Sequence, residues 1–150
     1  VFIFLLLFSL LKIVWNNRME LHDERFSIIA FVWWPFVIYS GWVTVASIAN
    51  VSTYLIKIDW NGFGISDITW TIVMIVIAVI INLVATWKRN MRVFALVGAW
   101  ALIGIANANT DINTTISSIA YVSAAIVLLN SASHAFINRK NNPFLNFKNK

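Results

Sequence analysis

The chain contains several runs of about 20 mostly apolar residues, the length that a helix needs to cross a hydrocarbon layer of about 30 Å. Within lipid, such a segment can satisfy all its backbone hydrogen-bonding groups only as a helix or in a closed barrel. Charged residues make up only 11% of the chain, against about 25% in an ordinary soluble domain. We therefore predict an all-α, polytopic transmembrane helix bundle.

Five apolar segments define the predicted spans. They are residues 1–14, a span within 26–56, and residues 68–87, 93–108 and 114–137. The first begins at Val1, already inside its apolar run, and we expect it to be a truncated span of a longer protein. The predicted organisation is a helical bundle over residues 1–137 followed by a basic tail over 138–150.

The second apolar segment, residues 26–56, is too long for one straight span at 1.5 Å per residue. The group Trp33-Trp34-Pro35 predicts an interfacial anchor followed by a kink or a helix start, because proline cannot donate a backbone hydrogen bond. At the start of the next span, Ser66 or Asp67 is the expected N-cap.

Basic residues are distributed unevenly among the connections. With five spans, ten of the 11 Lys and Arg residues fall on one side, in the first and third connections and the tail, and Lys57 alone on the other. Positive charge is retained on the cytoplasmic side of membranes. The loops around 16–25 and 88–92 and the C-terminus are thus predicted to be cytoplasmic, in a bacterial inner membrane. This orientation explains the net charge of +5 without a nucleic-acid partner.

Ionisable groups are missing from the predicted spans, since all six acids lie in connections or at helix ends. Pumps and ion-coupled transporters place such groups inside the membrane. The chain also has no cysteine and no nucleotide-binding or metallohydrolase motif. We therefore predict no enzymatic activity and no metal site.

The last four spans carry one asparagine each: Asn50, Asn82, Asn107 and Asn130. An unpaired amide is costly in hydrocarbon, so these side chains are expected to face one another or a cavity. They serve either as hydrogen-bonding contacts between helices or as the lining of a ligand pocket. His134 is expected to be a hydrogen-bonded interface residue rather than a haem ligand.

Small residues four positions apart indicate closely packed helices. The pairs are Ala95 with Ala99, Gly104 with Ala108, Ala120 with Ala124, and Ser131 with Ala135. Such pairs predict a bundle without indicating its function.

One stripe of the second span combines unlike side chains. Trp42, Ala46 and Asn50 are spaced four residues apart and lie on one helix face. A large indole, a small gap and an amide in that order could shape an apolar pocket with one polar contact.

The segment Pro35–Asn50 resembles the last-helix signature of the tryptophan-rich sensory protein family, also called the TspO/MBR or translocator protein family. In that signature a proline-aromatic pair precedes a tryptophan, which is followed by alanine four positions on and asparagine eight positions on. Trp42, Ala46 and Asn50 match it. The resemblance extends over residues 26–107 and includes the turn Trp60–Gly64.

The resemblance implies a ligand site for hydrophobic molecules, since the corresponding residues in the family are associated with a cavity for porphyrins, sterols or synthetic ligands. On this basis the candidate ligand-binding residues are Tyr39, Trp42, Ala46 and Asn50, with Pro35 beside them, and the candidate ligand is tetrapyrrole or lipid-like. The stretch from Trp100 to Asn107 repeats the Ile-Ala-Asn ending, which adds these two residues. In the core family the signature helix is the last one, whereas here three more spans follow.

Two other functions remain open at this level. The chain could be a structural or accessory subunit of a larger membrane complex, or a homo-oligomer, using its asparagine and small-residue faces for docking. It could also be a carrier for a neutral solute, because neutral cargo requires no charged group in a span.

Overall fold

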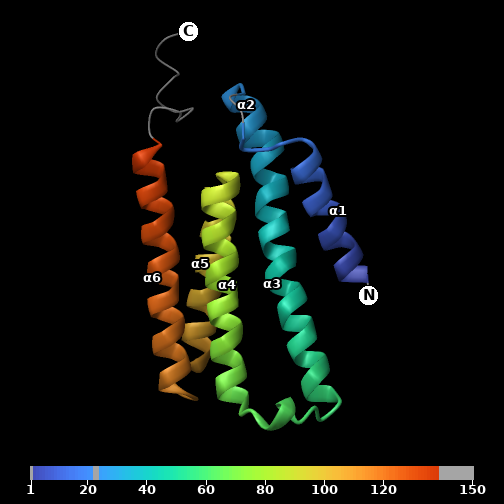
Figure 1. Ribbon diagram of the computed structural model, residues 1–150, viewed down its shortest axis with the longest axis vertical. Helices are drawn as coiled ribbons and strands as arrows, with labels where there is room; N and C mark the ends of the chain where they lie inside the picture. Colours follow the sequence, from blue (N-terminus) through green and yellow to red (C-terminus); the bar gives the residue numbers. More distant parts are fainter. Residues whose placement is uncertain (1, 22–23, 139–150) are drawn as a thin grey trace.

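The computed structural model describes residues 2–21 and 24–138, and these form a bundle of long antiparallel helices (Figure 1). The helices are α1 (Phe2–Asn16), α2 (Phe26–Ile28), a π-helical turn η1 (Ile29–Trp33), α3 (Trp34–Lys57), α4 (Asp67–Arg89), α5 (Arg92–Asn109) and α6 (Thr114–Ile137). A short 3-10 turn, η2 (Gly62–Gly64), connects α3 to α4. The predicted all-α class is confirmed.

Four helical runs are long and apolar enough to cross a membrane, namely Phe26–Lys57, Asp67–Arg89, Arg92–Asn109 and Thr114–Ile137, and α1 is a shorter apolar helix. Figure 1 shows the α1–α2 connection, the α4–α5 connection and the end of α6 at one end of the bundle. We call this the basic end, because Arg18, Lys88 and Arg92 lie there. The tail from residue 139 lies outside the described residues.

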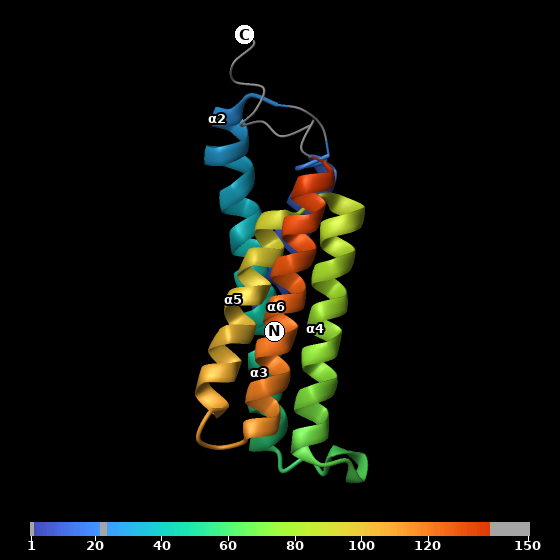
Figure 2. The same ribbon diagram turned by 90° about the vertical axis from the view of Figure 1, so that its left-hand side faces the viewer.

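α5 is the central helix, since it packs against α3, α4 and α6. Figure 2 shows α4 and α5 on either side of α6, which lies in front of them. The core between α4, α5 and α6 is built mostly from small side chains: Ile75, Ala95, Ala99, Leu102, Ala106, Ile116, Ala120, Ala124 and Val127. The close packing predicted from Ala95 with Ala99 and from Ala120 with Ala124 is thus confirmed, because short side chains let helix backbones approach.

A second core cluster lies at the basic end and joins α1 to α3 and α5. It contains Val14, Met19, Ile29, Trp33, Val37, Met91 and Phe94. Trp33 is only 5% exposed, so its indole does not face lipid or water, while the depth of the Trp33-Trp34-Pro35 group in the membrane stays a prediction. The indole instead fills the interior where α1 and its connection fold back onto α3.

The helix start predicted at Pro35 is confirmed for the α-helix itself, because α3 begins at Trp34, although helical turns precede it from Phe26 onward. Pro35 occupies the first turn of α3, where a missing N–H is tolerated, and η1 precedes it directly. A π-helical turn adds a residue to the helix without breaking it, and this accommodates the proline.

The ends of the other helices follow from local side chains. Ser66 Oγ accepts a hydrogen bond from Thr69 N at 3.3 Å, which confirms Ser66 as the N-cap of α4. Asn90 ends the same helix with a left-handed backbone (φ 56°), a conformation that asparagine tolerates better than most residues. Only two residues then separate α4 from α5, as expected for a tight hairpin.

The polar side chains of α3 bond mainly within their own helix. Six of them donate to the carbonyl oxygen four residues earlier at 2.7–3.1 Å: Ser40, Thr44, Ser47, Asn50, Ser52 and Thr53. Hydroxyl and amide groups satisfied in this way need no partner on another helix.

Candidate functional site

The sequence-predicted ligand residues of α3 lie on the outward side of the bundle. Val37, Ser40 and Val43 are buried on the inner side of α3, and the helical period therefore turns Tyr39 and Trp42 outward. Tyr39 is 50% exposed and Trp42 is 41% exposed. Ala46 is half-buried and Asn50 is exposed further along the same stripe.

The structure brings the two candidate tryptophans together. Trp42 of α3 and Trp100 of α5 have ring centroids 4.5 Å apart and an interplanar angle of 68°. Their contact depends on a close approach of the two helices, because an added Cβ at Gly41 would lie only 3.1 Å from Val97 Cβ. An edge-to-face aromatic pair of this kind is worth about 1 kcal/mol beyond the area it buries.

Beyond the tryptophan pair the outward surface carries small residues and then polar ones. Gly104 follows Trp100 by one turn of α5, and a Cβ added there would meet no atom within 4 Å. Asn107 follows on the same face, and its Oδ1 accepts a hydrogen bond from the hydroxyl of Tyr121 on α6. Within the described residues Asn50, unlike Asn107, forms no bond to another helix, and its Nδ2 donates to Ala46 O in its own helix at 2.8 Å.

We define the α3–α5 face as the outward surface of these two helices that carries the candidate ligand residues. Its members are Tyr39, Trp42, Ala46 and Asn50 on α3 and Trp100, Gly104 and Asn107 on α5. Tyr121 could not be singled out from the sequence, because its link to the face depends on the packing of α5 against α6. The face has an aromatic part, a part with small side chains and a polar part, in that order away from the basic end.

The four span asparagines do not pair with one another, so that half of the expectation was wrong, but two of them do form the predicted contacts between helices. Asn130 Oδ1 accepts a hydrogen bond from Trp87 Nε1 at 2.7 Å, and this bond joins α6 to α4. Asn82 is only 5% exposed and its Nδ2 donates to Ala78 O of its own helix. Asn107 and Asn130 thus connect helices, whereas Asn50 and Asn82 bond locally.

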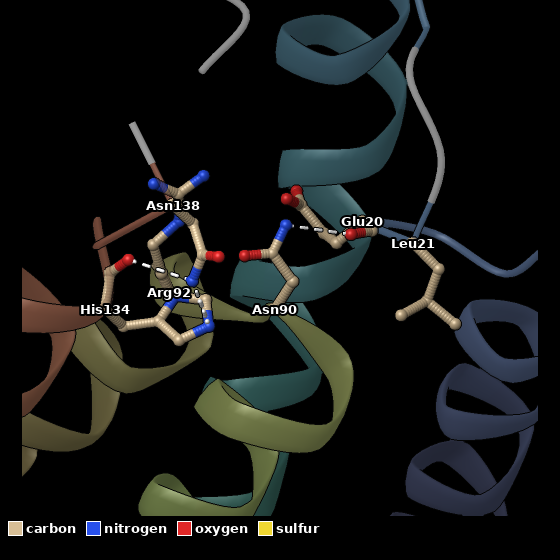
Figure 3. Close-up of a pocket in the computed structure, with 6 residues that line it drawn as sticks. All are labelled: Glu20, Leu21, Asn90, Arg92, His134 and Asn138. Atoms are coloured by element: carbon tan, nitrogen blue, oxygen red, sulfur yellow. Dashed lines mark hydrogen bonds between the residues drawn. The ribbon is translucent and has the colours of Figure 1, made fainter. Parts of the chain in front are cut away.

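A second site with polar side chains lies at the basic end, where a pocket of about 170 Å³ opens between the α1–α2 connection, the α4–α5 hairpin and the end of α6. Its lining residues are Glu20, Leu21, Asn90, Arg92, His134 and Asn138. Figure 3 shows Arg92, His134 and Asn138 on one side and Glu20 and Leu21 on the other, with Asn90 between them. We call it the basic-end pocket. His134 is 5% exposed and bonds to Asn138, as expected for an interface histidine.

Glu20 is turned inward although it belongs to a connection. Its backbone is left-handed (φ 65°), and its carbonyl oxygen accepts a hydrogen bond from Asn90 Nδ2 at 2.9 Å. Burial raises the pKa of the carboxyl group to about 6, although the positive charge of Arg92 and a hydrogen bond with Trp34 lower it in part. Glu20 therefore changes charge just below neutral pH.

Replacing Glu20 with glutamine should remove one pH dependence of stability. Because the pKa of the folded state, about 6, exceeds the ordinary value of 4.5, Glu20 stabilises the fold fully below pH 4.5 and loses this contribution as the pH rises through 6. The loss amounts to about 2 kcal/mol for a shift of this size. When unfolding is measured in detergent, the unfolding free energy of Glu20→Gln should rise relative to that of the wild type between pH 5 and 7.5. If the two proteins lost or gained stability in parallel over this range, the raised pKa assigned to Glu20 would be contradicted.

Comparison with known proteins connects this fold to one family. A family model described as TSPO-like protein matches residues 1–133, from α1 into the last turns of α6. No curated protein and no solved structure matches the chain.

Proposed function

The chain belongs to the TSPO-like protein family and is an integral membrane protein, and from this premise we propose that it binds a hydrophobic ligand, tetrapyrrole or lipid-like, against the α3–α5 face. The proposal gives the chain a binding role and no catalytic one. It assigns ligand contacts to Tyr39, Trp42, Ala46, Asn50, Trp100 and Asn107.

The observation that carries the proposal is the exposed pair of Trp42 and Trp100. Two indoles from different helices meet at an angle on the outer surface, with Trp42 41% and Trp100 59% exposed. Flat or ring-containing molecules gain both buried area and favourable ring contacts on such a surface. The open space at Gly104 lets a ligand approach the backbone of α5 beside the pair.

The polar end of the face supports a ligand with one polar group. Asn50 and Asn107 lie on the side of the tryptophan pair away from the basic end, and Tyr121 adds its hydroxyl to Asn107. A few polar groups in a mostly apolar site fix the orientation of a ligand rather than supply most of its affinity. We therefore assign orientation to the amides and most of the binding free energy to the two indoles.

Titration of the purified protein with protoporphyrin in detergent should quench tryptophan fluorescence with a saturable midpoint. Trp42→Phe should weaken the apparent affinity by roughly five- to tenfold, because a smaller ring loses about 1 kcal/mol of contact. Asn50→Ala should weaken it less. Trp15→Phe is the matched control, since it also removes one fluorophore from an exposed position, on α1, and should leave the midpoint unchanged. Equal midpoints for Trp42→Phe and Trp15→Phe would refute the proposal.

A second candidate function is supported by the same helix. Gly104 and Ala108 are exposed small residues four positions apart on α5, the spacing that lets another membrane helix dock closely. In this alternative the chain is an accessory subunit or a homo-oligomer, and the α3–α5 face is an interface. Absence of quenching together with purification in a complex of fixed stoichiometry, lost in Gly104→Leu, would favour it.

A further inference from the structure

The basic-end pocket contains an unusual share of unsatisfied polar atoms. In the described part of the chain, five buried side-chain nitrogen or oxygen atoms have no hydrogen-bond partner. Three of the five belong to this pocket: Glu20 Oε1, Asn90 Oδ1 and His134 Nδ1. Unsatisfied buried polar atoms are costly, and a concentration of them in one pocket indicates a ligand that supplies the missing partners.

The hydrogen-bonding role of His134 follows from Asn138. The amide nitrogen of Asn138 lies 3.1 Å from His134 Nε2 and 3.1 Å from His134 O. An amide NH₂ group only donates, so Nε2 of the neutral ring accepts and Nδ1 carries the proton. His134 Nδ1 is therefore a donor without an acceptor.

The pocket thus has two chemically different sides. Arg92 and His134 offer hydrogen-bond donors, and Arg92 is positively charged. Across from them Glu20 offers a carboxylate oxygen, and Asn90 between them offers a carbonyl oxygen (Figure 3). A ligand that satisfies both sides must carry an acceptor-rich anionic group at one end and a donor-rich cationic group at the other.

We propose that the basic-end pocket binds a phosphoethanolamine group, with its phosphate against Arg92 and His134 and its primary ammonium against Glu20 and Asn90. The pocket has a volume of about 170 Å³. Measured in the same way, one water molecule needs only roughly 10–15 Å³, so the pocket is large enough for a phosphoethanolamine group. This site lies outside the α3–α5 face and does not depend on the function proposed for it.

The position of the pocket favours the headgroup of a membrane phospholipid as the source. It lies at the end of the spans where the basic residues gather, which is the depth of phospholipid headgroups in a membrane. Leu21, 45% exposed at its rim, offers apolar contact to the remainder of a lipid. Free phosphoethanolamine also combines a phosphate with a primary ammonium, although its phosphate is a monoester and the lipid's is a diester, and an experiment must separate the two sources.

Native mass spectrometry of the full chain in detergent micelles can compare three short-chain phospholipids of equal acyl length. Phosphatidylethanolamine should bind about tenfold more tightly than phosphatidylcholine, whose quaternary ammonium has no N–H to donate to Glu20 and Asn90. Phosphatidylethanolamine should also bind about tenfold more tightly than phosphatidylglycerol, because the phosphatidylglycerol headgroup has no cation to contact Glu20 and Asn90. Equal binding of all three lipids by the wild-type protein would overturn the proposal without any variant.

Matched variants test the two sides of the pocket. Arg92→Gln should weaken binding of phosphatidylethanolamine about tenfold, whereas Lys88→Gln removes a charge from an exposed residue of the same end and should change it less than about twofold. Glu20→Gln should reduce the preference for phosphatidylethanolamine over phosphatidylcholine. Equal effects of Arg92→Gln and Lys88→Gln would assign the binding to overall charge and refute the site.

Soluble phosphoethanolamine completes the comparison. If it binds the wild type more weakly than the short-chain lipid and is displaced by that lipid, the ligand is the membrane phospholipid. If it binds as tightly as the lipid, the source is the free molecule, and the assigned headgroup chemistry is supported in both cases. Failure of phosphoethanolamine and of phosphatidylethanolamine to bind would refute the proposal.

Discussion

A Gly98→Leu variant is expected to lose the folded bundle in detergent, whereas Gly104→Leu on the same helix keeps it. A Cβ at Gly98 would lie within 2.6 Å of Asn82 Cγ, and both residues are buried where α5 packs against α4. Asn82 has little room to move, because its amide already donates to Ala78 O. Overpacking by a single methyl group costs about 2 kcal/mol, and a leucine adds three more carbon atoms at the same place.

The size of this effect can be measured by comparing single and double variants. Gly98→Ala should lower the unfolding free energy by about 2 kcal/mol, while Gly104→Ala should raise it slightly because alanine favours helix more than glycine does. Asn82→Ala in the Gly98→Ala background should restore most of the loss, since it removes the atoms that clash. Equal stability of Gly98→Ala and Gly104→Ala would show that α4 and α5 are not packed this closely.

The second large effect concerns orientation in the membrane, where we propose that the basic end is cytoplasmic. The chain has no cysteine, so a single introduced cysteine reports its own position without background. In intact cells a membrane-impermeant maleimide should label Phe63→Cys and Ile112→Cys, which replace residues 80% and 81% exposed at the end opposite to the basic end. Lys88→Cys should be labelled only after permeabilisation.

The expected difference is nearly all or none, because positively charged connections are retained on the cytoplasmic side. Labelling of all three cysteines in permeabilised cells is the control for reactivity. If Lys88→Cys and Phe63→Cys were labelled from the same side, the antiparallel bundle itself would be in error. If Lys88→Cys were labelled in intact cells and the other two cysteines only after permeabilisation, the antiparallel bundle would be supported and the proposed orientation would be wrong.

The spans were predictable because each depends on a local property, the length of an apolar run. The same is true of the Ser66 cap. Pro35 marked the start of an α-helix correctly, but a proline restricts only its own turn and did not reveal η1, which changes the winding of the helix just before it. From the sequence, a π-helical turn cannot be told from an α-helical one here, since both fit the apolar pattern.

The candidate site was predictable in part. Trp42 could be singled out from its stripe with Ala46 and Asn50, and Trp100 from the stretch that repeats the Ile-Ala-Asn ending. Their contact could not be predicted, because it requires α3 and α5 to approach at Gly41 and Val97.

The inward position of Glu20 could not be predicted from the sequence, since an acid in a connection is normally solvated. Its burial follows from a left-handed backbone and from a hydrogen bond to Asn90, a residue distant in the sequence.

The hydrogen bonds that the α3 side chains return to their own backbone change what this helix offers to its surroundings. Ser52 and Thr53 are exposed, and each already has its hydroxyl proton engaged. Hydropathy scales assign each serine and threonine the transfer free energy of a hydroxyl group without a hydrogen-bond partner. They therefore underestimate how readily α3 partitions into acyl chains. Exchange of these residues for alanine or valine should therefore be nearly neutral for insertion, and their presence in a relative would carry little information about which side of the helix faces lipid.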